Sequence, residues 1–215
     1  MAGHAVGLYG GLDHRAAMSP HADKAAACED HPVKDRFPPL TQATMSFEQA
    51  RVARGIAGTR GGDGVRGPFN MWLRVPDLAD RLQKVGAYIR YEASLPQKLV
   101  EMAICITARQ WNAAYEWHAH AALAKKEGLS PDILTAISAR TRPETMDPAE
   151  AAIWAFCTQL FAEHGVTEDR FAAVRDLFGE KGVTELTATC GYYVAVAMTL
   201  NVSQVKIPEG AIPFG

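Results

Sequence analysis

Residues 99–120 read LVEMAICITARQWNAAYEWHAH, and this stretch predicts both the fold and the functional site. It sets two carboxylates, Glu101 and Glu116, and two imidazoles, His118 and His120, among side chains that are mostly apolar. Burying ionisable groups beside apolar ones costs free energy unless the groups are paired or put to use. The stretch therefore indicates a functional cluster, which is a metal site, a redox site or an acid/base site.

The spacing of the two histidines argues against a metal site. The Ala-rich composition of residues 113–124 favours a helix, and helical residues two apart project roughly 200° apart. His118 and His120 therefore cannot share a metal ion there, although a strand would allow it. Glu116 and His120 are four apart and can meet on one helix face. The alternative is a surface ion pair, but the neighbouring Trp and Tyr residues are more typical of a core.

Glu101 supplies a geometric test, because it precedes His120 by nineteen residues. One continuous helix would hold the two about 28 Å apart, and they could not act together. Residues 110–112 are the predicted bend, with Asn112 as the cap that starts a second helix. Two antiparallel helices would then bring Glu101, Glu116 and His120 together.

The rest of the chain also predicts helices, so the predicted fold class is all-α. From Pro76 onward, one face of a helix would carry Leu78, Leu82, Val85 and Ile89. The next helix would start at Ser94-Leu-Pro-Gln97, with Ser94 as its cap. Residues 183–202 are long and apolar enough to suggest a membrane span, but their small and polar residues favour a buried or subunit-interface helix. Further helices are predicted at 113–127, from 130, from 147 to about 161, and at 167–177.

The 215 residues suit one domain of ordinary size with additional terminal segments. We expect a poorly ordered extension at 1–45, a Gly-rich segment leading into the domain at 46–66, the helical domain at 67–206, and a tail at 207–215. Six glycines within 54–68 raise the alternative of a phosphate-binding loop. No Lys-Ser or Lys-Thr pair closes that loop, so a flexible segment is the better interpretation.

Composition excludes several classes of partner and compartment. The formal net charge is −2 and the basic residues form no run, which argues against nucleic acid or an anionic membrane as the main partner. The four cysteines contain no C-x-x-C and their spacing is irregular, so we expect reduced thiols and a cytoplasmic protein. They are Cys28, Cys105, Cys157 and Cys190.

Residues 67–205, and most clearly 95–128, resemble the carboxymuconolactone decarboxylase/AhpD-like family. Its alkylhydroperoxidase branch carries a Glu, then C-x-x-C twelve residues later, then a His four residues after the second Cys. Here the Glu is Glu101 and the His is His120, but Ala113 and Glu116 occupy the two Cys positions. The decarboxylase branch carries a Glu and a His four apart, which Glu116 and His120 match. The resemblance therefore implies acid/base chemistry without redox thiols.

The resemblance also implies an AhpD-like helical bundle that self-associates into trimers or hexamers, with sites near subunit contacts. It implies that no metal or organic cofactor is needed, and that the reaction is decarboxylation of a small carboxylated lactone or a related intermediate of aromatic degradation. In that reaction we expect His120 to be the general acid/base, with a pKa near neutrality. Glu116 would orient and charge His120, and Glu101 would be its further partner or a proton relay.

Three more residues are candidates for substrate binding. Arg109 could bind a substrate carboxylate bidentately, although a structural ion pair with a nearby acid is the alternative. Trp111 and Tyr115 could form the pocket wall, or they could simply pack in the core. Two other functions stay open: a helical oligomer that binds a small apolar acid without turning it over, and a redox enzyme that has lost its thiols but kept a proton relay.

Overall fold

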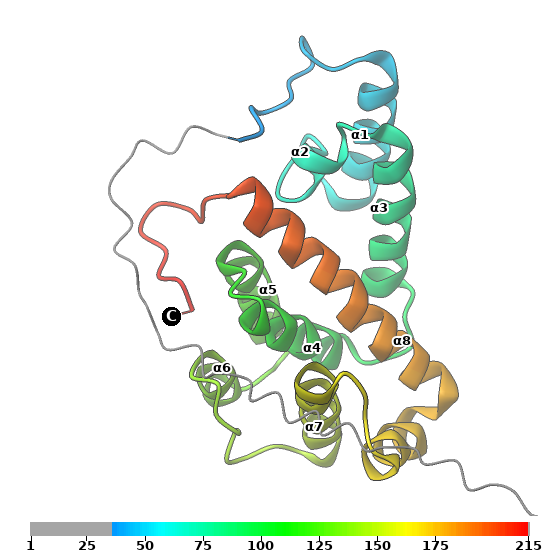
Figure 1. The fold of residues 1–215 in the computed structure, drawn as a ribbon, viewed down its shortest axis with the longest axis vertical. Coiled ribbons are helices and arrows are strands. Elements are labelled where there is room, and N and C mark those ends of the chain that lie inside the picture. The colour runs from blue at the N-terminus through cyan, green and yellow to red at the C-terminus, as the bar shows by residue number, and fades with distance from the viewer. Residues whose placement is uncertain (1–35, 215) are drawn as a thin grey trace, which may run out of the picture. The chain divides into compact units, whose positions relative to one another are not determined.

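The computed structural model describes residues 36–214, which contain eight helices and no strand (Figure 1). The predicted all-α fold class is therefore confirmed for this part of the chain. The portion of the predicted extension at residues 1–35 lies outside the described residues. The helices are α1 (Phe47–Arg60), α2 (Phe69–Trp72), α3 (Pro76–Tyr91), α4 (Gln97–Gln110), α5 (Ala114–Lys126), α6 (Pro131–Ser138), α7 (Pro148–Glu163) and α8 (Glu168–Ser203).

Helix α1 forms where the sequence suggested a flexible Gly-rich segment. Ser46 and Gln49 make a capping box, in which each side chain accepts a hydrogen bond from the other's backbone N–H. Val52 and Ile56 are buried on its inner face. Capping and burial together outweigh the glycines at 55 and 58, and the helix ends at Gly61, whose φ of 75° favours glycine.

Residues 36–45, which we expected to belong to a poorly ordered extension, contact the helical domain. The Asn70 side chain accepts from the Leu40 backbone N–H at 3.0 Å and donates to the Phe37 carbonyl at 2.8 Å. Leu40 is buried. This short segment is therefore fixed to α2 by a two-sided amide contact that the sequence did not indicate.

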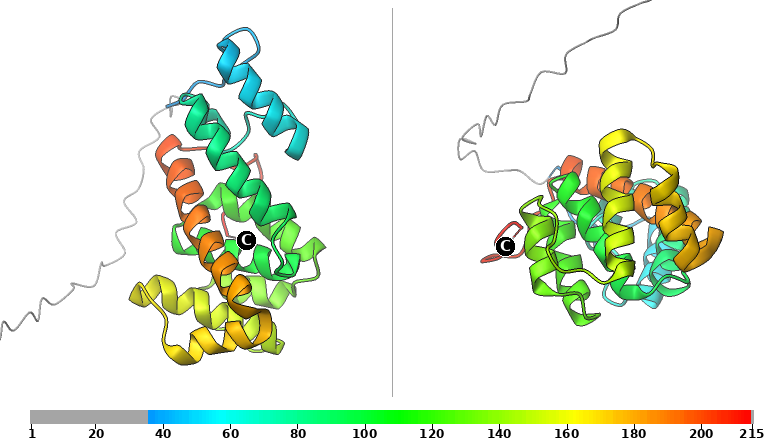
Figure 2. Two further views of the ribbon diagram at one scale, coloured as in Figure 1. Left: turned by 90° about the vertical axis from the view of Figure 1, so that its right-hand side faces the viewer. Right: turned by 90° about the horizontal axis from the view of Figure 1, so that it is seen from below.

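Helix α3 buries a different face from the one predicted. Ile89 is buried as expected, but Leu78 and Val85 are 45% and 46% exposed. The other buried positions of α3 are Ala79, Gln83 and Gly86, of which two are small. Small residues let neighbouring elements approach the helix backbone closely, and α3 lies beside α8 in both Figure 1 and Figure 2. The prediction from apolar periodicity was therefore wrong for Leu78 and Val85.

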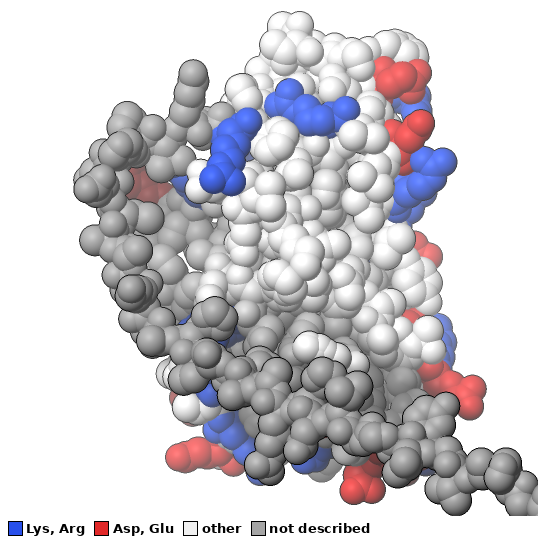
Figure 3. All heavy atoms as spheres, viewed as in Figure 1, with Lys and Arg blue, Asp and Glu red and all other residues white. Residues whose placement is uncertain are grey.

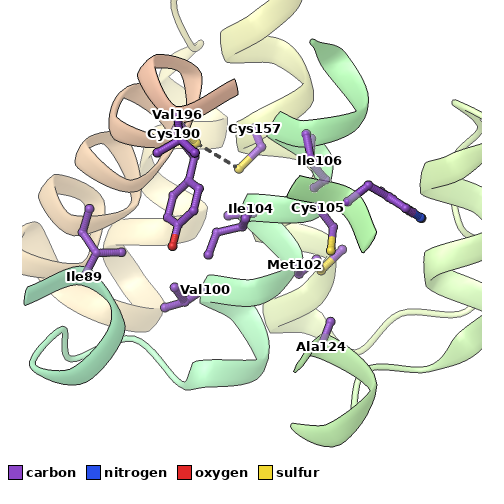
Figure 4. Packing of buried hydrophobic residues seen from close by; sticks show 14 of the residues in the cluster. Ile89, Val100, Met102, Ile104, Cys105, Ile106, Ala124, Cys157, Cys190 and Val196 are labelled. Atoms are coloured by element: carbon purple, nitrogen blue, oxygen red, sulfur yellow. Dashed lines mark hydrogen bonds between the residues drawn. The ribbon is translucent and has the colours of Figure 1, made fainter. Parts of the chain in front are cut away.

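The centre of the core is α4, in which every residue from Leu99 to Ala108 is buried. It packs against α5, α7 and α8. Figure 4 shows the apolar side chains of α4 facing those of α3, α5, α7 and α8. Because α4 is enclosed on all sides, any polar group that it carries must find a partner within the protein.

The chain bends between α4 and α5, as predicted, but Asn112 does not act as a helix cap. Asn112 has a left-handed φ of 49°, a conformation that Asn tolerates better than most residues. Its side-chain oxygen accepts from the guanidiniums of Arg109 and Arg140. The N-cap position of α5 falls on Ala113, which has no side-chain hydrogen bond to give. The bend is therefore fixed by a contact with a distant arginine as well as by the left-handed backbone at Asn112.

Ser94 does not cap α4 either. The N-cap position is Pro96, which makes no side-chain hydrogen bond. The Ser94 backbone N–H and hydroxyl both donate to Glu185 of α8, at 2.9 and 2.6 Å. A long-range acceptor has therefore replaced the local capping role that the sequence predicted.

Helix α8 joins the two predicted helices across a break at Gly179, whose φ of 69° and ψ of 179° are not helical. Its C-terminal part is tied to other elements by Thr199, which accepts from the Trp72 indole at 2.9 Å, and by Asn201, which donates to the Trp111 carbonyl at 2.8 Å. Within residues 36–214, none of the helices combines the length and hydropathy that a membrane span requires.

Charged side chains on the face seen in Figure 3 lie mainly towards its edges, and the middle of the described surface there is largely uncharged. The C-terminal part of α8 crosses this face in Figure 1. Two of its large apolar side chains, Met198 and Val202, are 44% and 50% exposed.

Candidate active site

Glu101, Glu116 and His120 form one buried chain of contacts between α4 and α5. His120 Nδ1 lies 2.6 Å from Glu101 Oε2, and His120 Nε2 lies 3.0 Å from Glu116 Oε1. The His120 side chain is 9% exposed, Glu116 5% and Glu101 2%. The bend at residues 111–113 folds α5 back onto α4, so a pair nineteen residues apart in sequence comes into direct contact.

Each member of this triad is held by a further contact. The second oxygen of Glu101 accepts from the Gln97 side chain at 3.0 Å. The His120 ring packs edge-on against Tyr193, with 5.1 Å between the ring centroids. Glu116 uses one oxygen, Oε1, towards His120, and no hydrogen bond from residues 36–214 engages its other oxygen. Glu101 is therefore a fixed partner, whereas Glu116 retains an acceptor that a bound molecule can reach.

The surroundings of His120 hold its imidazole in the charged form. Burial by itself lowers the pKa of His120, but the charge of Glu116 and the hydrogen bond with Glu101 outweigh burial and raise this pKa to about 9. We expected a pKa near neutrality, and the structure corrects that expectation. At pH 7 the ring is an imidazolium whose two nitrogens both carry protons, so it is poised to donate a proton rather than to ligate a metal.

The triad opens on a cavity of about 130 Å³. This is close to the roughly 150 Å³ of an engineered protein cavity that binds benzene, so a single small ring is the size of molecule it suits. Glu116 and His120 form one side. The other lining residues include three tyrosines and three arginines from α1, α3, α5, α8 and the loop before α2: Tyr115, Tyr192, Tyr193, Arg60, Arg66 and Arg90.

The tyrosines of the cavity are neutral phenols. Burial raises the pKa of Tyr192 to about 12 and that of Tyr193 well above its ordinary value. Burial, followed by the charge of Glu116, also raises the pKa of Tyr115. These rings therefore supply apolar faces and hydroxyl donors to the cavity without adding negative charge.

Only one of the three residues predicted to bind substrate lies at this cavity. Tyr115 lines it. Arg109 instead donates to the Ser138 carbonyl at 2.6 Å and stacks over Phe214 at 4.6 Å, beside a separate cavity bounded by α4, α6 and α7. Trp111 is half-buried at the end of α4. The structure therefore does not bring Arg109 and Trp111 to the triad.

The sequence analysis did not single out Arg60, Arg90 or Tyr192. Their positions in the chain, on α1, α3 and α8, gave no local pattern that pointed to a shared site. One available signal was Arg90 in the last turn of α3, following small residues that favour close helix packing. Even that signal does not say which helix packs there, so convergence of the three side chains is a tertiary result.

The cysteines in the described part of the chain are free and do not line the cavity. Burial, followed by the charges of Glu101 and Glu116, raises the pKa of Cys105 well above its ordinary value. Cys157 and Cys190 face one another across α7 and α8 with 3.6 Å between their sulfur atoms (Figure 4). A reactive thiol needs a lowered pKa and access, and Cys105 has neither.

Comparison with known proteins agrees with this architecture. Residues 76–159 match the model of the carboxymuconolactone decarboxylase family. The matched segment runs from α3 into α7 and includes Glu101, Glu116, His120 and Arg90. Arg60 and Arg66 precede it.

A similar solved structure is the crystal structure of the debrominase Bmp8, as a cysteine-to-alanine variant in complex with 2,3,4-tribromopyrrole. The two chains are 16% identical, the similarity covers 82% of this chain and 94% of that one, and the TM-score is 0.62. At this identity the similarity shows a shared fold. No match was found among curated proteins.

Proposed function

We propose that this protein is a cofactor-free acid/base enzyme that decarboxylates a small carboxylated lactone or a related ring acid. The observation that carries the proposal is the buried Glu101–His120–Glu116 triad, opening on a cavity of single-ring size. The family match supports catalysis on a small molecule. The absence of C-x-x-C from the sequence, and the buried state of Cys105, Cys157 and Cys190, favour acid/base over thiol chemistry.

The proposed reaction breaks the bond between the ring and its carboxylate. The bonding electron pair moves into the conjugated ring as an extended enolate, and CO2 leaves. The imidazolium of His120, a positive charge fixed at the cavity, stabilises the developing negative charge. A proton must then reach a carbon of the enolate.

His120 is the proposed source of that proton. Its Nε2 lies 3.0 Å from Glu116 Oε1, and Glu116 lines the cavity, so Glu116 can relay the proton to a molecule bound there. Glu101 does not line the cavity, and its role is to hold Nδ1 and keep the ring charged. After transfer, the neutral imidazole takes up a proton from water, which balances the consumption of one proton per CO2 released.

The test is CO2 release from a panel of carboxylated lactones and β-keto acids. His120→Gln should lower turnover by roughly 10²- to 10⁴-fold, the range expected for loss of a general acid. The matched control is His118→Gln, because His118 lies two residues away on the same helix but is exposed. Equal turnover by wild type and His120→Gln would exclude His120 as the proton donor. A ligand retained in native mass spectrometry, with no product formed, would favour a binding protein instead.

Self-association into a trimer or hexamer is a further part of the proposal. Large apolar side chains are exposed along α3 and the end of α8, and Leu78, Val85 and Tyr91 of α3 are 45%, 46% and 53% exposed. Contiguous exposed apolar side chains are typical of subunit contacts. The free thiols of Cys105, Cys157 and Cys190 support the predicted cytoplasmic location.

A further inference from the structure

Two half-buried arginines at the cavity, Arg60 and Arg90, each have a buried Nε without a hydrogen-bond partner among residues 36–214. Neither arginine forms an ion pair with a carboxylate in that part of the chain. Arg60 makes one long contact from Nη2 to the Gln83 carbonyl, at 3.4 Å. Buried donors of a charged group are costly to leave unpaired, so this arrangement favours a bound anion.

Aromatic rings, rather than carboxylates, contact the two arginines. Arg60 lies over the face of Phe69 at 5.2 Å, and Arg90 lies over Tyr91 at 5.3 Å. Aromatic faces hold a guanidinium in place while leaving its N–H groups available. Arg60 and Arg90 line the cavity together with Glu116 and His120. A molecule in contact with the triad is therefore also within the reach of both guanidiniums.

Gly86 makes room for this arrangement. A Cβ atom at Gly86 would lie 2.3 Å from Tyr192 Oη and 2.7 Å from Arg60 Nη2. Both distances are too short for non-bonded atoms, so any larger residue would displace the Tyr192 hydroxyl and the Arg60 guanidinium. The obstructed atoms are the outer ends of two side chains, the Arg60 guanidinium and the Tyr192 phenol. A substitution at Gly86 should therefore shift them without disturbing the helix packing.

We propose that Arg60 and Arg90 form an anion-binding subsite beside the triad, and that Gly86 makes room for it. The ligand group is a carboxylate, because a planar guanidinium fork matches its two oxygens. The subsite rests on the proposed function in one respect. We take its ligand to be a second acidic group of the substrate, one that stays on the molecule when CO2 leaves. Pairing the departing carboxylate with a guanidinium would stabilise the ground state and oppose loss of CO2. Helix α1, which precedes the family-matched segment, thereby contributes to substrate choice.

The experiment compares benzoate with benzamide, two probes of similar shape that differ in charge. Their dissociation constants would be measured by calorimetry on the full chain at low salt. Benzoate should bind wild type about tenfold or more tightly than benzamide. Arg60→Gln and Arg90→Gln should each weaken benzoate by about tenfold or more and leave benzamide unchanged. Arg54→Gln is the matched control, because Arg54 lies on the same helix as Arg60 but is exposed.

Gly86→Ala tests the geometry without removing any charge. It should weaken benzoate by displacing Arg60, while circular dichroism and the melting temperature show that the fold is kept. If either arginine variant fails to fold, the benzoate affinity of Gly86→Ala still tests whether the subsite exists. Three outcomes would overturn the subsite. Wild type could bind the two probes equally, or it could fail to bind benzoate up to 20 mM, which is roughly the weak limit for a small fragment. The third outcome is full benzoate affinity in Gly86→Ala.

These measurements involve no turnover, so they separate the subsite from the proposed reaction. Selective benzoate binding without CO2 release from any lactone would leave the subsite standing and remove the decarboxylation proposal. The opposite result is loss of CO2 release in His120→Gln together with unchanged benzoate binding in both arginine variants. It would support the decarboxylation proposal and remove the subsite.

Discussion

The raised pKa of His120 predicts a specific dependence of stability on pH. The folded-state pKa is about 9, against an ordinary value of 6.5. A group whose pKa is raised by folding contributes stability that is fully present below its unfolded pKa and is lost as pH rises through its folded pKa. For His120 this window runs from about pH 6.5 to above pH 9. The folded protein should therefore lose stability on the alkaline side of neutrality.

The size of the effect follows from the two pKa values. At about 1.36 kcal/mol per pKa unit, proton linkage gives a full contribution of about 3 kcal/mol. Integration between about pH 6.5 and 8.5 gives a loss of about 2 kcal/mol in the free energy of unfolding. This interval stays largely below the ordinary pKa of a thiol, so the buried cysteines contribute little to the change.

The assay is urea denaturation at about pH 6.5 and pH 8.5, for wild type, His120→Gln and the exposed control His118→Gln. Wild type and His118→Gln should both lose about 2 kcal/mol between the two pH values, and His120→Gln should lose much less. NMR titration of the His120 ring in wild type would give the same pKa directly, even if the variant were too unstable to measure. A midpoint near the ordinary value of 6.5, or an identical pH dependence in wild type and His120→Gln, would refute the reasoning.

Four further outcomes are expected. Glu101→Gln should lower the pKa of His120 and shift the alkaline limb of the pH–rate profile to lower pH, because it removes the charge at 2.6 Å from Nδ1; an unmoved limb would contradict this. Arg109→Gln should change the melting temperature but leave kcat/KM unchanged, because its contacts are to Ser138 and Phe214. Iodoacetamide should label native Cys105 far more slowly than the urea-unfolded chain, as mass spectrometry would show. Leu78→Glu should shift the molar mass in light scattering towards the monomer, and an unchanged oligomer would place the subunit contact elsewhere.

Residues 113 and 116, which the family resemblance aligns with the two redox cysteines, each have a defined place in the structure. Ala113 is fully buried at the start of α5, and Glu116 lies one turn later against His120. Glu116 thus supplies a carboxylate whose charge raises the pKa of His120. In the proposed function, this helix start serves proton transfer in place of thiol chemistry.

Local sequence indicated the helices from α3 onward, the bend and the pairing on one helix face, but it indicated neither α1 nor α2. The four-residue spacing of Glu116 and His120 brings them together on any α-helix, and the helix-breaking stretch at residues 110–113 allows Glu101 to reach the same ring. Those inferences need only the rise and period of a helix. The all-α class follows for the same reason, because each predicted segment has a helical pattern of its own.

Tertiary packing decided what local pattern could not. Leu78 and Val85 are exposed because α3 presents its small residues to its neighbours, and periodicity does not show which face a neighbour will cover. Ser94 bonds to Glu185, ninety-one residues away, in preference to its own helix. Arg60, Arg90 and Tyr192 meet at the cavity only because α1, α3 and α8 pack together there. The proposed proton donor could therefore be found in the sequence, whereas the surface that would recognise the substrate required the fold.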